Sequence, residues 1–225
     1  MEYLPILKEK NGKIIVAGQI ERLKAHRKPP VRHATAIIAA ILPDGRILLA
    51  DKTEKQRKKG KAIPDYVHIY DCFGGHMRYD SIPEQEHREG LSVETFRECA
   101  YRELSEELLR VDIDGSSRPF VPVRESLTPV GFYSMENDHN REYSWAFLYV
   151  LPDFGPYTSE DTLTKPDGEE SISQPVRAVS LDELLKLYQK GESCREMISD
   201  GIGRVLKRDN GKELRQCIEV VLNAR

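Results

Sequence analysis

The chain has 225 residues, 39% of them hydrophobic, which is enough to bury one substantial core. Its formal net charge of −3 supplies no broad positive field, so the composition does not favour a partner that is a nucleic-acid polymer. No apolar segment is long enough to span a membrane, so no membrane partner is expected either.

Two further features predict a cytoplasmic location. Residues 1–5 lack the charged start and the long apolar stretch of a secretory signal. The cysteines are widely spaced and include no CxxC pair, which indicates reduced thiols rather than a zinc site or a disulfide framework. These cysteines are Cys72, Cys99, Cys194 and Cys217.

The first half of the chain is predicted to consist mainly of strands. Apolar runs bounded by turn residues, proline or charge have the length of strands in four places. Residues 19–26 are either a helical turn or the exit from the first of these strands. The strand candidates are residues 13–17, 34–42, 47–50 and 67–73.

The second half mixes helices and strands. Residues 93–110 carry apolar side chains at four-residue steps and are predicted to form one helix. Ser180 and Glu183 match a capping box that opens a helix ending at Lys190, whereas residues 152–175 are predicted to be a long loop. The other candidates are strands at 127–133, 143–150 and 176–179, and one or two amphipathic helices within 194–225. This order predicts an α+β fold with helices on both faces of a mixed β-sheet.

Residues 102–107 place three carboxylates on one side of the predicted helix. Steps of three and four residues are neighbours on an α-helix, so Glu103 lies beside both Glu106 and Glu107. Clustered carboxylates repel one another, and hard oxygen ligands of this kind suit magnesium or, as a substitute, manganese. The alternative is a solvated acidic helix face supported by an Arg102–Glu106 pair.

The sequence before this helix favours the metal site. An apolar stretch ends in Gly74-Gly75-His76, and Glu94 precedes Arg102 by eight residues. With residues 102–107, this pattern resembles the signature of the Nudix hydrolase family. Two departures accompany the resemblance: residues 77–90 look like an insertion, and Leu109 stands where the family has a glycine.

The resemblance implies a Nudix-type α/β/α sandwich and a role for each residue of the motif. It implies that Glu103, Glu106 and Glu107 hold magnesium against a diphosphate. Arg102, Glu103 and Glu106 are then the catalytic residues: Arg102 braces the carboxylates, and Glu103 is a ligand or the general base. One Nudix domain is expected over residues 1–225, with its core at about 10–190 and a C-terminal helical extension at about 194–225.

One branch of the family is more similar than the others. It contains isopentenyl diphosphate isomerase and hydrolases related to it. In the isomerase a catalytic cysteine stands two residues before the motif histidine, where this chain has Gly74, and Cys72 lies two residues too early. Isomerase activity is therefore not expected. The residues that carry this resemblance are Asn11-Gly12-Lys13, Gly18, Arg22, His33, residues 45–50, Asp71 and Gly74-Gly75-His76.

Three residues outside the acidic helix are candidates for substrate binding. Gly75 and His76 belong to the glycine turn, and Glu142 begins a strand after a polar turn, where Nudix enzymes often recruit an extra carboxylate. The alternative for His76 is a purely structural role. The basic residues 52–61 are interpreted as a solvated loop, with a phosphate-facing role as the alternative.

The sequence thus predicts a magnesium-dependent hydrolase that cleaves a diphosphate linkage, with a nucleotide-derived small molecule as the substrate. A non-catalytic Nudix module that senses a nucleotide is the main alternative, and the diphosphate isomerase is a weaker one. A homodimer is left open.

Overall fold

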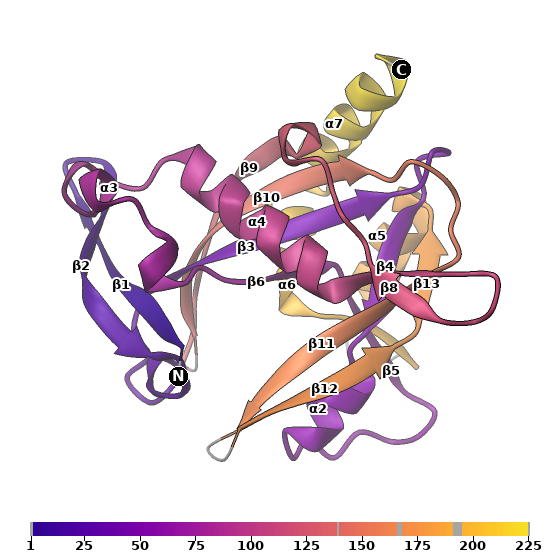
Figure 1. Cartoon of the computed structure of the whole chain (residues 1–225), viewed down its shortest axis with the longest axis horizontal. Coiled ribbons are helices and arrows are strands. Elements are labelled where there is room, and N and C mark those ends of the chain that lie inside the picture. Colours follow the sequence, from indigo (N-terminus) through magenta and orange to yellow (C-terminus); the bar gives the residue numbers. More distant parts are fainter. Residues whose placement is uncertain (1, 139, 166–167, 191–194, 225) are drawn as a thin grey trace.

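The computed structural model describes residues 2–138, 140–165, 168–190 and 195–224. Within them a central sheet runs in the order β14 (Glu196–Ile198), β5 (His68–Asp71), β4 (Ile47–Asp51), β3 (His33–Ile41), β10 (Arg141–Val150), β9 (Thr128–Glu136) (Figure 1). In addition, β13 (Val176–Val179) pairs with β4, and β6 (Phe73–His76) pairs with β3. The β3–β10 and β5–β14 pairs are parallel and the others antiparallel, so the sheet is mixed, as predicted.

Strand β3 is buried on both faces of this sheet. Successive side chains of a strand point to opposite faces, and β3 divides accordingly. Ala36 and Ile38 belong to one hydrophobic cluster, whereas Ile37 and Ile41 belong to a second one. A layer of helices on each side is needed to cover these two apolar faces.

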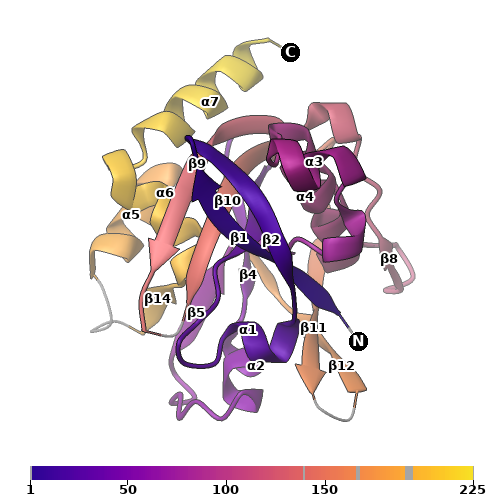
Figure 2. The same ribbon diagram turned by 90° about the vertical axis from the view of Figure 1, so that its left-hand side faces the viewer.

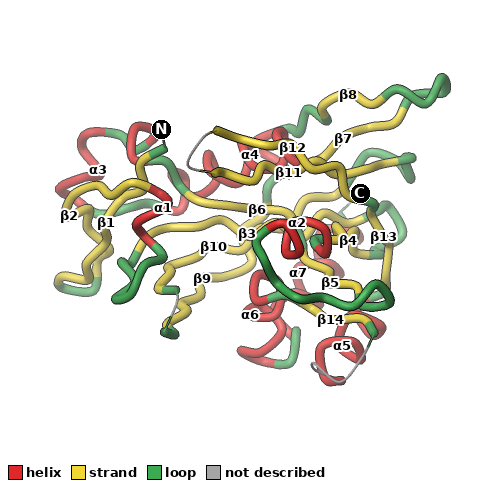
Figure 3. Tube along the Cα trace, turned by 90° about the horizontal axis from the view of Figure 1, so that it is seen from below, coloured by secondary structure: helices red, strands yellow, loops and turns green. Residues whose placement is uncertain are grey.

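The helices supply those two layers. α4 (Val93–Glu107) packs on one face, where it contacts β3, β6 and β10. α5 (Leu181–Lys190), α6 (Asp200–Asp209) and α7 (Lys212–Asn223) contribute to the second cluster, on the opposite face (Figures 2 and 3). The predicted α/β/α sandwich with a mixed sheet is therefore confirmed. Among the described residues, no helix has the length and apolar character that crossing a membrane requires.

Helix α4 is shorter than the sequence predicted. Ser92 caps its N-terminus by accepting a hydrogen bond from the Thr95 amide at 3.3 Å. The helix ends at Glu107, and Leu108 begins β7 (Leu108–Val111), which pairs with two further strands. The prediction that the helix extends to residue 110 is wrong because this pairing draws the apolar residues after Glu107 into a sheet.

The long loop predicted at 152–175 is also wrong. This segment forms a hairpin of β11 (Tyr157–Lys165) and β12 (Gly168–Gln174), and β11 pairs with β7, which in turn pairs with β8 (Ser117–Pro119). Along β11, Tyr157, Ser159, Asp161 and Leu163 are buried in alternation with more exposed neighbours. Two of these buried residues are polar, so the period of two does not stand out as a hydrophobic pattern.

The single strand predicted at 67–73 is two strands. β5 ends at Asp71 and pairs with β4, whereas β6 begins at Phe73 and pairs with β3. Cys72 lies at the change of partner, and its amide donates a hydrogen bond to the Asp71 carboxylate at 2.9 Å. The other predicted strands and the Ser180–Glu183 capping box are confirmed.

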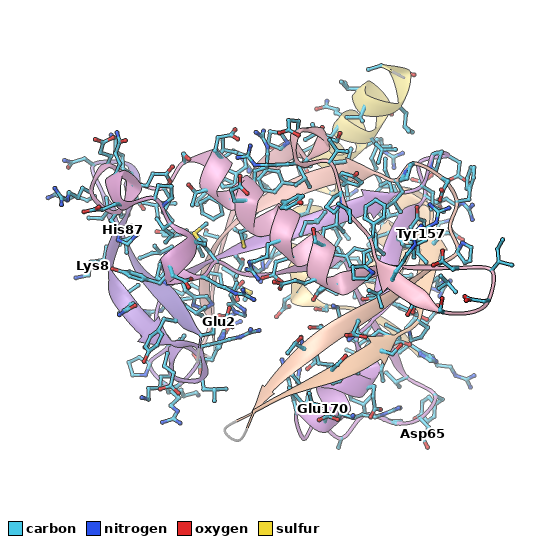
Figure 4. All side chains as sticks on the ribbon, viewed as in Figure 1. Glu2, Lys8, Asp65, His87, Tyr157 and Glu170 are labelled. Carbon is cyan, nitrogen blue, oxygen red and sulfur yellow. The ribbon has the colours of Figure 1, made fainter. Side chains whose placement is uncertain are left out.

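The N-terminus forms a hairpin that was only partly predicted. β1 (Tyr3–Lys10) and β2 (Lys13–Glu21) are joined by Asn11 and Gly12, both with positive φ, and α1 (Arg22–Ala25) follows. The insertion at 77–90 contains the 3₁₀ helix η1 (Tyr79–Ser81) and α3 (Glu84–Glu89), which contact β1 and β2 respectively. Lys8 of β1 and His87 of α3 lie at the same corner of the molecule (Figure 4).

The C-terminal segment forms the predicted amphipathic helices, α6 and α7, and also an edge strand, β14, that was not predicted. Cys194 lies outside the described residues. The remaining short helices are α2 (Thr53–Lys58), which follows β4, and η2 (Arg124–Ser126), which precedes β9.

Candidate active site

Arg102 connects the acidic surface of α4 to strand β6. Its guanidinium lies 2.5 Å from Oε1 of Glu103 and 2.9 Å from Oε2 of Glu106. The same side chain donates a hydrogen bond to the backbone carbonyl of His76 at 2.7 Å. One arginine thus holds two of the three motif carboxylates next to the glycine turn.

Glu103 is buried directly against Gly75. Only 8% of Glu103 is exposed, and a Cβ atom on Gly75 would collide with its carboxylate. Burial raises the pKa of Glu103, although the positive charge of Arg102 opposes this effect. Gly75 therefore creates the space that the carboxylate occupies.

Glu106 lies on the solvent side of the same surface, with 46% of its side chain exposed. Arg78, the second residue of the insertion, lies 3.2 Å from Oε1 of Glu106. Arg78 also lies 3.5 Å from Glu2, which is labelled in Figure 4. The insertion therefore contacts the acidic helix through Arg78, while η1 and α3 pack on the N-terminal hairpin.

Glu107 forms the inner end of the acidic surface. It accepts hydrogen bonds from the Gly74 amide at 3.1 Å and from Nζ of Lys52 at 3.3 Å. Burial raises the pKa of Glu107 to about 8, with the charge of Lys52 acting in the opposite direction. Both carboxylate oxygens thus have a partner within the protein.

Lys52 belongs to a buried ion-pair network that the sequence did not reveal. Its ammonium group lies 2.9 Å from Asp161 of β11, and Lys55 lies 2.5 Å from the same carboxylate. Although burial alone lowers the pKa of Lys52, the charges of Glu107 and Asp161 raise it above its ordinary value. The interpretation of residues 52–61 as a solvated loop is therefore wrong for Lys52, which is 7% exposed.

Three histidines converge beside the glycine turn. The rings of His26, His33 and His76 lie 4.9–5.2 Å apart, and one nitrogen from each lies within 4.8 Å of the others. Neither ring nitrogen of His76 has a hydrogen-bond partner. Burial lowers the pKa of His26 to about 4 and that of His76 well below its ordinary value. Both rings are therefore neutral at pH 7.

Neutral imidazole nitrogens are ligands for Zn²⁺ and similar transition metals. Within the part of the chain that the structure describes, this is the one group of three such donor side chains that converges so closely. The three glutamates of α4 do not form such a group. His76 was singled out in the sequence, whereas His26 was not, because only the fold brings the turn after α1 next to β6.

Glu142 lies beside this histidine cluster. Its Oε1 is 3.6 Å from Nε2 of His33, and its Oε2 is 2.5 Å from the guanidinium of Arg204 on α6. Although burial raises the pKa of Glu142, the adjacent His33 ring and the Arg204 charge lower it to about 2. Arg204 also hydrogen-bonds to the Ser144 hydroxyl at 2.6 Å. The C-terminal extension thus fixes a residue of the site, which the sequence did not indicate.

The structure has no room for the isomerase cysteine. Gly74 has φ +139°, and a Cβ atom at this position would collide with the backbone carbonyl of Ala36. Cys72 is buried, and burial together with the Asp71 charge raises the pKa of its thiol well above the ordinary value. A buried, protonated thiol is a poor nucleophile.

No protein-family model matches the chain, and neither does any curated protein. Solved structures resemble it at low identity. The Deinococcus radiodurans protein DR0079 is 16% identical, with 92% of this chain and 98% of that chain covered and a TM-score of 0.49. A MutT protein from Methanosarcina mazei is 14% identical, with 83% and 95% covered and a TM-score of 0.43. The Nudix domain of NrtR from Shewanella oneidensis, complexed with ADP ribose, is 9% identical, with 88% and 99% covered and a TM-score of 0.41. The solved structures that resemble this chain thus include a MutT protein, a MutT Nudix hydrolase from Burkholderia pseudomallei and a Nudix domain, and Nudix is the family that the sequence motif resembles.

Proposed function

We propose that this protein is a magnesium-dependent Nudix hydrolase that cleaves a diphosphate linkage in a nucleoside diphosphate derivative. The arrangement around Arg102 supports the proposal best, because one guanidinium holds Glu103 and Glu106 while also binding the carbonyl of His76. The glycine turn and the acidic helix are therefore joined as one unit. Manganese is a possible substitute for magnesium, because it also accepts oxygen ligands.

The donor groups on α4 fit a hard cation. Carboxylate oxygens are the side-chain ligands that magnesium prefers, and it retains part of its water shell. Glu106 is the most accessible of the three carboxylates, and its partners, Arg78 and Arg102, are arginines that a divalent cation could replace. Glu107 is held by Lys52 and the Gly74 amide, so we assign it the innermost position in the proposed site.

Each residue then has a distinct role. Magnesium, when bound, would neutralise diphosphate oxygens and lower the pKa of a coordinated water. Glu103 is the proposed general base, because its burial against Gly75 raises its pKa towards the range in which a carboxylate accepts a proton effectively. Arg102 orients Glu103, while Gly75, His76 and Glu142 are the proposed substrate-binding residues.

The two alternatives differ in what they require. The isomerase needs a thiol at position 74, where the Ala36 carbonyl leaves no space for a side chain. A nucleotide-sensing module would use the same surface without turnover, and it is distinguished by assay rather than by geometry.

The test is incubation of the full chain with magnesium and a panel of nucleotide sugars, dinucleotides and nucleoside triphosphates, followed by chromatography of the products. We expect Glu106→Gln to abolish most turnover, because the substitution removes a proposed ligand but keeps the shape of the side chain. Glu98→Gln is the matched control, since Glu98 is similarly exposed on α4 and contacts Arg124 instead. Nucleotide binding without turnover of any substrate would support the sensing module. Near-normal turnover of Glu106→Gln at saturating magnesium would remove Glu106 from the site.

A further inference from the structure

A cavity lies near the start of α4, apart from the candidate active site. It has a volume of about 530 Å³, which is within the size range of small-molecule sites. The N-terminal hairpin and the junction between the insertion and α4 form two of its walls, and β9 and β10 form the others. Its lining residues are Glu9, Gly12, Lys13, Ile14, Glu89, Gly90, Leu91, Ser92, Phe96, Phe132, Tyr143 and Trp145.

Aromatic rings form the floor of this cavity. The ring of Phe132 lies 6.4 Å from Phe96, 5.5 Å from Tyr143 and 6.0 Å from Trp145, measured between centroids. Phe96 and Tyr143 are buried, whereas Phe132 and Trp145 are only partly buried and line the open space. Partly exposed rings at the base of a cavity favour a planar aromatic ligand, because ring stacking adds to the burial of apolar surface.

The rim of the cavity is polar and carries more negative than positive charge. Glu9 and Glu89 each supply a carboxylate, and Lys13 supplies one ammonium group. Gln85 donates a hydrogen bond to Glu89, and the Tyr143 hydroxyl lies 3.5 Å from Glu9, so no arginine or lysine in these contacts neutralises either carboxylate. Such a rim disfavours a polyphosphate and provides acceptors for amino groups.

The cavity is separate from the acidic surface of α4. From Ser92 to Glu103 the helix axis rises by about 16 Å at roughly 1.5 Å per residue. None of the proposed metal ligands and none of the three histidines lines the cavity. The N-terminal hairpin packs here on the segment that joins the insertion to α4: the Leu91 amide donates a hydrogen bond to the Ile14 carbonyl at 2.8 Å. This cavity is thus where the insertion meets the hairpin and the sheet.

We propose that this cavity is a second binding site, which takes an uncharged planar aromatic ring with an exocyclic amino group, as in an aminated nucleobase or its nucleoside. The ring packs against Trp145 and Phe132, whose planes are inclined at 59° to each other, and the amino group donates to a rim carboxylate. This proposal does not depend on hydrolase activity.

Trp145 allows binding at this site to be measured by fluorescence, because it is the only tryptophan in the chain. Its fluorescence, excited at the red edge so that nucleosides do not absorb, should change saturably when adenosine is added. Inosine, which lacks the amino group, should bind at least about fivefold more weakly, which corresponds to one lost hydrogen bond of about 1 kcal/mol. ATP should also bind more weakly than adenosine at this site.

Three variants locate the binding. Ile14→Phe, which fills part of the cavity, and Glu89→Lys, which reverses a rim charge, should each weaken the adenosine response. Glu106→Gln is the matched control and should leave the response unchanged even if it abolishes turnover. The proposal is overturned if folded protein gives no saturable response, if adenosine and inosine respond equally, or if Glu106→Gln removes the response. If the fluorescence changes with the protein concentration and not with the nucleoside concentration, the cavity is instead occupied by a second copy of the chain.

Discussion

Two regions of the molecule, the acidic surface of α4 and the histidine cluster beside β6, differ in whether their potential metal-ligand atoms already have partners within the protein. On α4, the protein itself provides the cations: Arg102 and Arg78 bind the outer carboxylates and Lys52 the innermost. In the histidine cluster, both ring nitrogens of His76 lack a hydrogen-bond partner. Buried polar atoms are nearly always hydrogen-bonded, so these nitrogens indicate a ligand more directly than the glutamates do.

The contrast shows that a recognisable sequence motif does not by itself give a site whose ligand atoms are ready to bind a metal. The glutamates are recognised from spacing along one helix, yet their oxygens are engaged in ion pairs that a metal must partly replace. The histidines come from the end of α1, where His26 follows the last helical residue, and from β3 and β6, and their spacing carries no familiar signature, yet their donor atoms converge. The first region is expected to be held together by its internal cations and the second to respond to an added metal.

The largest effect should come from removing the internal cation of the acidic surface. Lys52→Met would leave Glu107 and Asp161 buried without their shared partner, and breaking such a pair costs about 3–5 kcal/mol of unfolding free energy. Urea titration monitored by circular dichroism measures this loss. Lys58→Met is the matched control from the same segment, because Lys58 contacts Glu170 at the surface. The Lys58→Met protein should therefore be nearly as stable as the parent.

A double variant keeps this prediction testable if Lys52→Met does not fold. Asp161 keeps its contact with Lys55, so Glu107 is the carboxylate left without a cation, and adding Glu107→Gln should restore part of the lost stability. A Lys52→Met protein as stable as the parent would mean that the buried network does not stabilise the acidic surface.

Zinc should stabilise the protein through the histidines. At a zinc concentration of a hundred times the dissociation constant, binding adds about 2.7 kcal/mol to the folded state. The melting temperature should rise with zinc and return to its starting value after chelation. His76→Gln should remove the rise, whereas Glu106→Gln should retain it. A rise that survives His76→Gln but not Glu106→Gln would instead place the zinc on α4.

Acid should weaken the histidine region before it affects the rest of the fold. Burial lowers the pKa of His26 to about 4, below the ordinary value near 6.5 that it has when unfolded. The unfolded chain therefore binds more protons between these values, so the stability is complete above pH 6.5 and falls as the pH decreases towards 4. For His26, the loss between pH 7 and pH 5 should be about 1–2 kcal/mol.

Urea midpoints at the two pH values measure this loss, with His26→Gln as the comparison. The variant should show a smaller decrease than the parent over the same interval. An identical decrease in both proteins would show that another group titrates.

The sequence alone predicted those contacts that join residues close together in the chain. Arg102 and Glu106 are one helical turn apart, and Ser180 and Glu183 cap their own helix, so their spacing alone predicted their contacts. Apolar runs predicted the buried strands for the same reason. By contrast, Asp161 reaches Lys52 over more than a hundred positions of sequence, on a strand whose alternation includes polar side chains. Only the fold places it there.

Arg204 illustrates the same limit at the other end of the chain. From the sequence, Arg204 is only one of the charged residues of an amphipathic helix, and nothing in the sequence links it to Glu142. The pairing depends on α6 packing against the sheet, with the Ile202 amide donating to Asp71 at 3.0 Å. A buried carboxylate in a strand, such as Glu142, does signal that a cation must come from elsewhere, but it does not say from which segment.

The smallest effect is expected at Cys72, which lies at the change from β5 to β6. Its thiol is buried and protonated, and water is the proposed nucleophile, so Cys72→Ala should leave the turnover of a magnesium-dependent substrate nearly unchanged. The loss of one buried sulfur atom should lower the unfolding free energy by on the order of 1 kcal/mol. Steady-state kinetics of the variant at saturating magnesium provide the measurement, with circular dichroism as the control for folding. A folded Cys72→Ala protein without turnover would contradict hydrolysis by water and restore a thiol mechanism, despite the absence of space for a side chain at position 74.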